Sequence, residues 1–418
     1  MTLRPLQLFA AAPHLFLVAT LAVMLFRPPD ADLLPYDRGA FVLLLVAVAL
    51  NLVLKRRAFP FVPGLTLPML ALLALAIASA LTQSYSAQNW SLLAAKLLVP
   101  FVMFHVAAVV FGNSKSLRLF RAFCFIALAY LCFVSIAFLA GIPGIVPSYI
   151  TDESIGIHAD RARGPFLQAV ANGVTLNMLG LLTLTALRSR WWLRVSAYAL
   201  LVALPFAILA TMTRAVWLGF AASILFAWFL APTRRIRKTC AGILLGGGAA
   251  VALGILIGGM PDSLQDRLRE SSPIEFRRAV YEISWDMLGE KPLLGWGQGQ
   301  MPLEIENRIS GYRPNGYAAH NTFLEILVEH GLVGLGLYLW ILGKLFRLAQ
   351  RAHRREPEGE FVRELRALWP ICLAVYLFNA NFVVMNYQFV NALLFTLAGI
   401  LVKRSWPEEK MSPYAASV

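Results

Sequence analysis

The sequence is poor in charged residues: only 14% of its 418 residues are Asp, Glu, Lys or Arg, whereas 59% are hydrophobic. A soluble globular domain carries about 25% charged and about 45–50% apolar residues. The low charge and the mean hydropathy of +0.66 therefore exclude a water-soluble protein. They also exclude a disordered chain, because disordered segments have low hydrophobicity. The class that remains is a polytopic membrane protein.

Cysteine is scarce as well, with four residues in the chain. Cys124, Cys132, Cys240 and Cys372 all fall inside apolar runs. We interpret them as small buried hydrophobic residues and not as a disulfide or metal set. No spacing typical of metal ligands occurs in the sequence, and we expect no cofactor.

Apolar runs long enough to cross a bilayer recur along the chain. About 20 helical residues span a hydrocarbon core about 30 Å thick. The sequence therefore predicts an all-α polytopic membrane protein with about twelve transmembrane helices. We place them near residues 6–26, 39–54, 63–81, 91–111, 118–140, 168–187, 193–210, 214–231, 239–259, 322–346, 366–382 and 386–403. At 211–213 and 383–385 the connection is so short that two spans could instead form one helix.

The basic residues fall mostly on one side of this topology. Most of the 37 Lys and Arg residues lie in the two termini and in the turns of that side. By the positive-inside rule, this side and both termini are cytoplasmic, as in a multi-pass protein of a bacterial inner membrane. Because the basic residues are scattered over many turns, they orient the chain in membrane lipid and do not form a nucleic-acid-binding face.

The predicted spans divide the chain into four parts. Residues 1–259 hold spans one to nine, residues 260–321 form a large outer loop, residues 322–403 hold spans ten to twelve, and residues 404–418 form a cytoplasmic tail. A loop as long as the second part is usually either functional or disordered. We therefore expect much of the function to lie there.

The large loop contains a helix signal of its own. Ser272-Pro273-Ile274-Glu275 is typical of a helix N-terminus. An apolar stripe follows, which predicts a helix lying along a surface or groove: Phe276, Val280, Ile283 and Met287. Arg277, Tyr281 and Trp285 share another face. The alternative is a peripheral helix whose basic residues meet lipid headgroups.

A glycine-rich segment follows this helix, and residues 291–299 read Lys-Pro-Leu-Leu-Gly-Trp-Gly-Gln-Gly. Its glycines do not form a dinucleotide-binding fingerprint, because they neither follow a strand nor open a βαβ unit. We expect a tight, re-entering loop with exposed backbone amides, which could approach a phosphate closely. A plain turn is the alternative.

Several cations are predicted at the outer membrane level, where the positive-inside rule disfavours them: Lys96, Arg161, Arg163, Arg214 and Arg277. A charge at mid-helix costs roughly 2.5–3.5 kcal/mol on translocon scales, so it needs a reason. Each cation alone could reach the interface with its long side chain. Together they favour a polyanionic ligand such as a lipid-linked pyrophosphate, because the arginine fork matches phosphate oxygens.

His320 is the remaining chemical group at this level. Histidine is a usable proton acceptor at neutral pH, although a lone histidine is more often structural. His320 precedes a predicted helix that carries Glu325 and Glu329 four residues apart. The glycines farther along, Gly331, Gly334 and Gly336, allow a neighbouring segment to approach closely.

These residues together resemble a known family. The run from His320 to Gly334 reads His-Asn, nine residues and Gly-Leu-Val-Gly, and it resembles the signature of the O-antigen ligases within the O-antigen ligase and polymerase superfamily. Four further features are similar to that superfamily's pattern: Arg277, the segment 292–299, the Thr213-Arg214 pair, and the segment 161–166 followed by Asn172. The resemblance covers roughly residues 160–340. One departure is Tyr281, where relatives often carry Trp.

The resemblance implies a membrane glycosyltransferase of the GT-C kind that acts in lipopolysaccharide biosynthesis. Its donor would be a preassembled glycan on undecaprenyl pyrophosphate, and its acceptor lipid A-core oligosaccharide, at the periplasmic face. The reaction would be metal-independent and inverting. His320 would be the general base, and Arg214 and Arg277 would hold the pyrophosphate. The other candidate substrate-binding residues are Lys96, Arg161, Arg163, Asn172, Arg278, Gln298, Asn321 and Glu325.

Three alternatives stay open. An O-antigen polymerase pairs an Arg with a Gly eleven positions on, a spacing that Arg278 and Gly289 meet. A protein O-oligosaccharyltransferase shares the His-Asn motif but usually carries an additional soluble segment after its last span. A transporter would show inverted repeats and charges near span centres, and the sequence shows no such symmetry.

Overall fold

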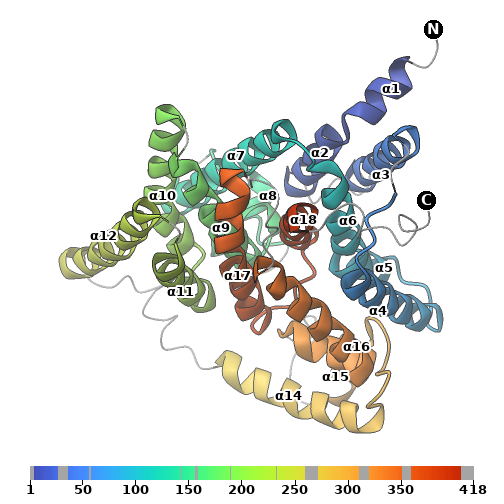
Figure 1. Ribbon diagram of the computed structural model, residues 1–418. Coiled ribbons are helices and arrows are strands. Elements are labelled where there is room, and N and C mark those ends of the chain that lie inside the picture. Colours follow the sequence, from blue (N-terminus) through green and yellow to red (C-terminus); the bar gives the residue numbers. More distant parts are fainter. Residues whose placement is uncertain are drawn as a thin grey trace.

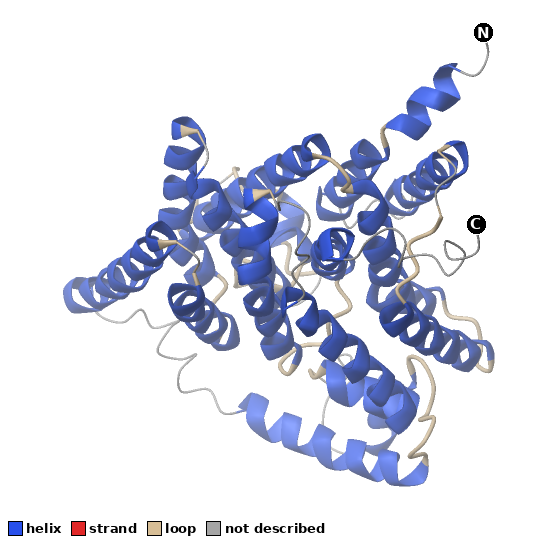
Figure 2. Cartoon of the chain, in the orientation of Figure 1, coloured by secondary structure: helices blue, strands red, loops and turns tan. Residues whose placement is uncertain are grey.

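Helices account for all the regular secondary structure that the computed structural model assigns to its described residues (Figure 2). The described residues are 4–26, 36–55, 58–142, 144–155, 159–188, 190–231, 233–258, 272–309, 320–350 and 359–405. Residues 406–418 of the tail, and residues 260–271 and 310–319 of the large loop, therefore lie outside the description. The all-α prediction is confirmed for the described part of the chain.

Figure 1 follows the helices from end to end. They are α1 (Arg4–Ala11), α2 (Pro13–Phe26), α3 (Tyr36–Leu54), α4 (Pro63–Leu81), α5 (Ala87–Leu93), α6 (Val99–Val110), α7 (Ser114–Leu139), α8 (Ser148–Thr151), α9 (Ala169–Thr183), α10 (Trp191–Ala210), α11 (Arg214–Leu230), α12 (Arg234–Gly258), α14 (Ser272–Glu290), α15 (Gln300–Arg308), α16 (Thr322–Arg347), α17 (Glu360–Ala380) and α18 (Gln388–Ser405). A π-helical turn, η2 (Ala94–Leu98), joins α5 to α6.

Each predicted span coincides with a helix or with a run of consecutive helices. Within the described residues, seven helical segments are long and apolar enough to cross a membrane, and shorter apolar helices cover 13–26, 214–230 and 388–403. The chain is therefore a polytopic membrane protein. The short connections at 211–213 and 383–385 are true breaks, because neither pair of neighbouring helices merges into one.

Two predicted spans are less regular than expected. The span 6–26 consists of two helices, because Pro13 begins α2 and cannot donate a hydrogen bond to α1. The span 91–111 contains the π-helical turn η2, which frees the backbone carbonyl of Ala95 from the regular ladder. The side chain of Asn391 donates to that carbonyl at 2.9 Å.

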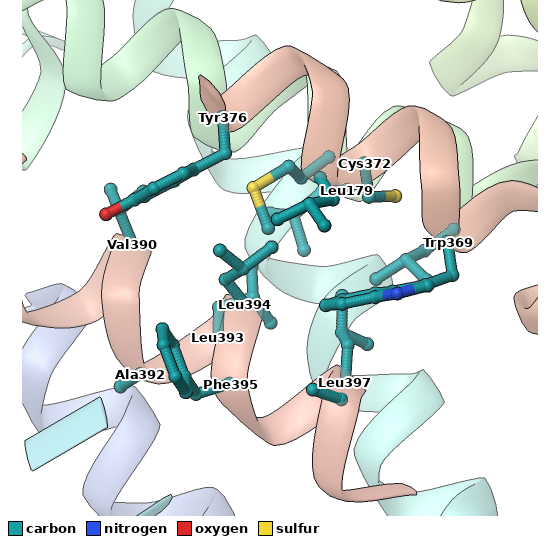
Figure 3. Close-up of a cluster of buried hydrophobic side chains, with 14 of the residues drawn as sticks. Leu179, Trp369, Cys372, Tyr376, Val390, Ala392, Leu393, Leu394, Phe395 and Leu397 are labelled. Atoms are coloured by element: carbon teal, nitrogen blue, oxygen red, sulfur yellow. The ribbon is translucent and has the colours of Figure 1, made fainter. Parts of the chain in front are cut away.

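The centre of the bundle is formed by α9, α17 and α18. The apolar segment that includes α9 is wholly buried, and α18 is seen end-on near the centre of Figure 1. Figure 3 shows how side chains of α18 such as Leu394 and Leu397 pack with Trp369 of α17 and Leu179 of α9. This core fixes the position of the segment between α17 and α18.

The outer helices present large apolar side chains to their surroundings. Examples are Leu43 on α3, Leu67 on α4, Val202 on α10 and Phe226 on α11, each at least half exposed. Such a surface is stable in lipid and unfavourable in water. The four cysteines are all free and buried, as the sequence predicts.

Candidate functional site

The helix α16 is broken in the middle at Gly331. Its φ of 64° and ψ of −166° lie in a region that only glycine adopts readily. The break separates two helical halves and removes the regular helical partners of four backbone groups: the carbonyls of Val328 and Glu329, and the amides of Leu332 and Val333. Buried backbone groups of this kind need other partners.

The glycine-rich segment after α14 supplies those partners. Trp296 N–H donates to the Val328 carbonyl at 2.9 Å, and Gly297 N–H donates to the Glu329 carbonyl at 2.8 Å. In the other direction, the amides of Leu332 and Val333 donate to the carbonyls of Pro292 (2.9 Å) and Leu293 (3.2 Å). The segment 292–297 thus replaces the missing turn of α16. The glycine-rich segment 291–299 and the glycine motif that begins at Gly331 therefore contact each other directly.

Four consecutive backbone amides of this segment, those of residues 296–299, donate to partners within the protein. Besides the two bonds to α16, Gln298 N–H donates to Ser79 Oγ at 3.2 Å, and Gly299 N–H donates to Glu329 Oε1 at 2.8 Å. The expectation of exposed amides is therefore wrong for residues 296–299, whose amides have partners within the protein. Gln298 itself is buried, with its side-chain oxygen 3.2 Å from His330 Nε2.

A buried ion cluster lies beneath the first half of α16. Lys96 Nζ is 2.8 Å from Glu325 Oε1 and 3.5 Å from Glu329 Oε2. Lys96 and Glu329 are buried, and Glu325 is nearly so. Because two carboxylates already offset the charge of Lys96, this lysine serves to join the π-helical turn to α16. The cluster also holds the glycine-rich segment, through the bond from Gly299 to Glu329.

His320 directly precedes the N-cap residue of α16. The cap is Asn321, whose side-chain oxygen accepts from the amides of Phe323 (2.9 Å) and Leu324 (3.1 Å). His320 adopts a left-handed backbone with φ of 49°. Among the described non-glycine residues, Leu167 and Met212 share this feature, with φ of 53° and 45°. His320 is itself a candidate site residue, Met212 lies two positions before Arg214, and Leu167 lies between Arg163 and Asn172. Such strain concentrates at functional sites.

The helix α14 packs on protein and not on lipid alone. Figure 1 shows it along the edge of the bundle beside α15 and α16. Its apolar stripe joins a buried cluster with side chains of those helices and of the segment between α17 and α18: Val280, Met287, Met301, Ile305, Leu324, Val328 and Val384. The predicted helix start at Ser272 is found, although the side chain of Phe276 lies outside the described residues. The apolar stripe of α14 therefore lies in a groove of the protein, as the sequence predicts.

The polar face of α14 points towards the start of α16. Tyr281 hydroxyl accepts a hydrogen bond from Asn321 Nδ2 at 3.4 Å. Arg277, one turn earlier on α14, places its guanidinium carbon 5.9 Å from the centre of the Phe382 ring. The arginine on this face of α14 thus meets an aromatic ring from the turn that follows α17.

The segment after Phe382 is tied to the start of α16. Thr322 Oγ1 donates to the Val383 carbonyl at 2.9 Å and accepts from Met385 N–H at 2.9 Å. Because Arg277 lies against Phe382 and Thr322 is two residues after His320, the structure brings Arg277 and His320 to one region. Thr322 and Phe382 are site residues that sequence reasoning missed; the helix break at 383–385 was the available signal.

Arg214 begins α11 at the same end of the bundle. α11 packs against α17 so closely that a Cβ on Gly219 would lie 3.1 Å from Asn379 Nδ2, near the end of α17 that leads to Phe382. Arg214 is exposed. Arg161 lies next to this turn as well, because Ala162 N–H donates to the Ala210 carbonyl at 3.0 Å.

Three candidate substrate-binding residues have other partners. Arg163 is fully buried and donates to the carbonyls of Ile150 (2.7 Å) and Tyr149 (3.5 Å), and also to those of Asp152 and Ile155. Asn172 donates to Ser135 Oγ at 3.1 Å and to the Ala162 carbonyl at 2.8 Å. Arg278 is exposed and pairs with Glu282 at 2.9 Å. The first two hold the loop that carries Arg161.

An ion pair fixes the junction of α14 and α15. Arg308 donates to both carboxylate oxygens of Glu290, at 2.6 and 3.1 Å, and this hydrogen bonding lowers the pKa of Glu290. Arg308 and Lys291 also lie over the Trp296 ring, at 4.9 and 3.9 Å from its centre. Trp296 is therefore held in place on both its backbone and its ring.

Comparisons with known proteins agree with the resemblance noted in the sequence. Residues 198–339 match a family model described as O-antigen ligase. The exopolysaccharide production protein ExoQ of Rhizobium meliloti (strain 1021) is 30% identical over 205 residues, which is 46% of this chain and 45% of the relative. The match thus spans about half of each protein. The family segment contains Arg214, Arg277 and His320.

Proposed function

We propose that this chain, whose residues 198–339 match a family model described as O-antigen ligase, is a membrane glycosyltransferase that uses a lipid-linked glycan as its donor. In the reaction we favour, a preassembled glycan passes from undecaprenyl pyrophosphate to lipid A-core oligosaccharide at the periplasmic face. The observation that carries the proposal is the hydrogen bond from Asn321 to Tyr281, at 3.4 Å. Asn321 directly follows His320, and Tyr281 lies one helical turn after Arg277, so this bond links the parts of the chain that carry the two residues.

The proposed chemistry needs a base and a site for the leaving group. The acceptor sugar hydroxyl attacks the anomeric carbon of the glycan, and the bond from that carbon to the pyrophosphate oxygen breaks. His320 takes the hydroxyl proton as the new glycosidic bond forms. Undecaprenyl pyrophosphate leaves with the bonding electrons. Direct displacement of this kind inverts the configuration at the anomeric carbon.

The cations around His320 suit a pyrophosphate. Arg277 and Arg214 approach the region from α14 and α11, and an arginine fork binds phosphate oxygens through two parallel hydrogen bonds. Stabilising charge that develops on the leaving group is commonly the largest contribution to such catalysis. Arg161, on the loop held by Arg163 and Asn172, is a further candidate contact. Lys96 has a supporting role, because its charge is already offset by Glu325 and Glu329.

Glu325 is a candidate contact for the acceptor sugar. One carboxylate oxygen binds Lys96 at 2.8 Å, whereas the other is buried and forms no hydrogen bond with a described residue. Glu325 lies one turn after Asn321, whose carbonyl accepts its backbone N–H at 3.0 Å. A sugar hydroxyl would satisfy the second oxygen. Arg278 and Gln298 have no place in this proposal as substrate contacts, since one faces solvent and the other is buried beneath the glycine-rich segment.

A polymerase reaction is the second candidate, and one observation favours it. The matching relative from Rhizobium meliloti is described as an exopolysaccharide production protein, and not as a ligase. In a polymerase the acceptor is another lipid-linked glycan. The same base and the same pyrophosphate site would serve, so the two reactions differ in the acceptor alone.

Reconstitution with defined acceptors tests the proposal. The purified protein in vesicles receives a labelled lipid-linked glycan together with lipid A-core, with excess lipid-linked glycan, or with a protein acceptor. We expect label on lipid A-core. A ladder of lengthened lipid-linked glycans would establish the polymerase instead, and label on protein would establish an O-oligosaccharyltransferase. Movement of the donor across the bilayer with no new glycosidic bond would refute glycosyl transfer.

A further inference from the structure

A separate cavity of about 630 Å³ lies between α7, α9, α10 and α17. It is formed where α7, α10 and α17 begin, as its lining residues Arg118, Leu193 and Phe361 show. At their other ends, α7 and α10 reach the candidate site, through Ser135 and Ala210. Because the 20 residues of α10 span about 30 Å, the cavity is remote from His320.

The polar part of the cavity is basic. Arg118, Arg121 and Arg190 line it, and none of its described lining residues is acidic. Arg121 is held in place by the Thr185 carbonyl, to which it donates at 3.4 Å, and by the Phe361 ring, 4.9 Å away. Arg118 and Arg190 form no ion pair with a described residue. Arg118 and Arg190 therefore offer their charge to an anion, whereas the charge of Arg121 is also attracted by Glu364 and Glu360.

The rest of the cavity is apolar and opens towards the bilayer. Phe125, Ile126, Trp192 and Leu193 line this part. Ile126 is 62% exposed and Trp192 is 49% exposed, so both lie at the outer surface of the bundle. A ligand that fills the whole cavity must combine an anionic head with an apolar tail, and it can enter sideways from the membrane.

We propose that this cavity binds one anionic phospholipid from the surrounding bilayer. The phosphate lies between Arg118 and Arg190, close to Arg121, and an acyl chain follows the groove past Ile126 and Leu193. The cavity volume is within the range of about 300–1,000 Å³ that is usual for ligand sites. The charge pattern of the sequence predicts this end of the bundle to be cytoplasmic, where anionic lipids attract basic side chains. The bound lipid bridges α7 and α10.

The amount of lipid that stays bound to the purified protein tests the proposed site, and this test does not need transferase activity. The full chain is reconstituted in vesicles of phosphatidylglycerol and phosphatidylcholine in equal parts, extracted into mild detergent, and examined by native mass spectrometry. We expect one phosphatidylglycerol to remain bound to the protein. We expect the double variant Arg118→Gln/Arg190→Gln to retain at least tenfold less phosphatidylglycerol. The double variant Arg237→Gln/Lys238→Gln, with the same charge change on exposed residues of α12, retains it.

A second variant separates lipid binding from simple charge attraction. Ala122 also lines the cavity. Ala122→Trp fills the apolar part with no change in charge, and we expect the same loss of the bound lipid. Equal retention of phosphatidylcholine and phosphatidylglycerol, or unchanged retention in both the double variant and Ala122→Trp, would overturn the proposal. Full displacement of the lipid by millimolar inorganic phosphate would also overturn it, because the site would then recognise a free anion.

Discussion

Gly331 and Leu293 meet so closely that a Cβ on Gly331 would lie 2.2 Å from the Leu293 carbonyl oxygen. This contact positions the first half of α16, and therefore His320, relative to the segment that follows α14. A helix without the break would carry its first half in another direction. The Gly-Leu-Val-Gly motif thus sets the geometry of the candidate site from a distance of eleven residues along the chain.

Gly331→Ala should destabilise the protein and impair transfer. A side chain at this φ and ψ costs about 1–3 kcal/mol, and the clash with Leu293 adds to that cost. Thermal unfolding in detergent measures the effect. The control is Gly336→Ala, five residues later in α16, because a Cβ there meets no atom within 4 Å. The control should gain up to about 1 kcal/mol of stability. Equal melting temperatures for the two variants would contradict the role of the kink.

Lys96→Met should be strongly destabilising. It leaves Glu325 and Glu329 together in a buried site without a cation, a loss worth about 3–5 kcal/mol for a buried pair. The triple variant Lys96→Met/Glu325→Gln/Glu329→Gln removes all three charges and should recover most of the melting temperature. Lys344→Met, at a half-buried lysine near the other end of α16, is the control. A single variant as stable as the control would show that the cluster does not support the fold.

Arg163→Lys should loosen the loop 149–155. A lysine cannot replace the set of bonds from one guanidinium to four carbonyls. The loss of bonds to a charged group is worth about 2 kcal/mol, which equals a roughly 30-fold rise in amide hydrogen exchange. Exchange measured by mass spectrometry over the loop tests this expectation. Arg278→Lys, on the exposed side of α14, should leave the loop unchanged. Equal exchange in the two variants would remove Arg163 from its structural role.

The contact between α14 and α15 should weaken in acid. Hydrogen bonds from Arg308 lower the pKa of Glu290 below its usual value of about 4.3. For a lowered carboxyl pKa, the stabilisation is complete above the unfolded-state value and is lost as pH falls through the folded-state value. Hydrogen exchange of residues 300–308 should therefore accelerate below about pH 4. In Glu290→Gln this pH dependence should disappear; a variant with the same pH profile as the unchanged protein would contradict the assignment.

The helices could be predicted from the sequence, and the contacts between them could not. Bilayer thickness fixes how many apolar residues a span needs, so α7, α10 and α16 fall where hydropathy places them. The bond from Lys96 to Glu325 joins residues 229 positions apart, and no local pattern reveals such a pair. The sequence therefore predicted Lys96 as a ligand-binding cation, whereas the structure gives it two carboxylate partners.

Some features of the candidate site could likewise be predicted from the sequence, and others could not. Arg277 and Tyr281 share a face of α14 because helical periodicity requires it, and this could be read from the sequence. The break at Gly331 could not, because it depends on a segment more than thirty positions earlier that supplies the replacement hydrogen bonds. The burial of Arg163 was equally hidden, since an arginine beside a loop is normally exposed.

Arg277→Lys tests the pyrophosphate site apart from the base. A point charge keeps the attraction but loses the paired hydrogen bonds, so we expect transfer to fall by about tenfold to a hundredfold. Donor affinity should fall as well, since Arg277 would hold the donor before and during the reaction. Arg278→Lys is the matched control on the neighbouring, exposed position. Unchanged transfer and affinity in Arg277→Lys would remove this residue from the site.

The most direct measurement follows donor binding and glycan transfer together in His320→Ala. Because the base and the pyrophosphate contacts are separate groups, the account predicts loss of transfer by at least a hundredfold, with donor affinity within about threefold of the unchanged protein. The variant His14→Ala, on α2, should transfer normally. Transfer at the normal rate in His320→Ala, or donor binding lost along with it, would contradict the assignment of His320 as the general base.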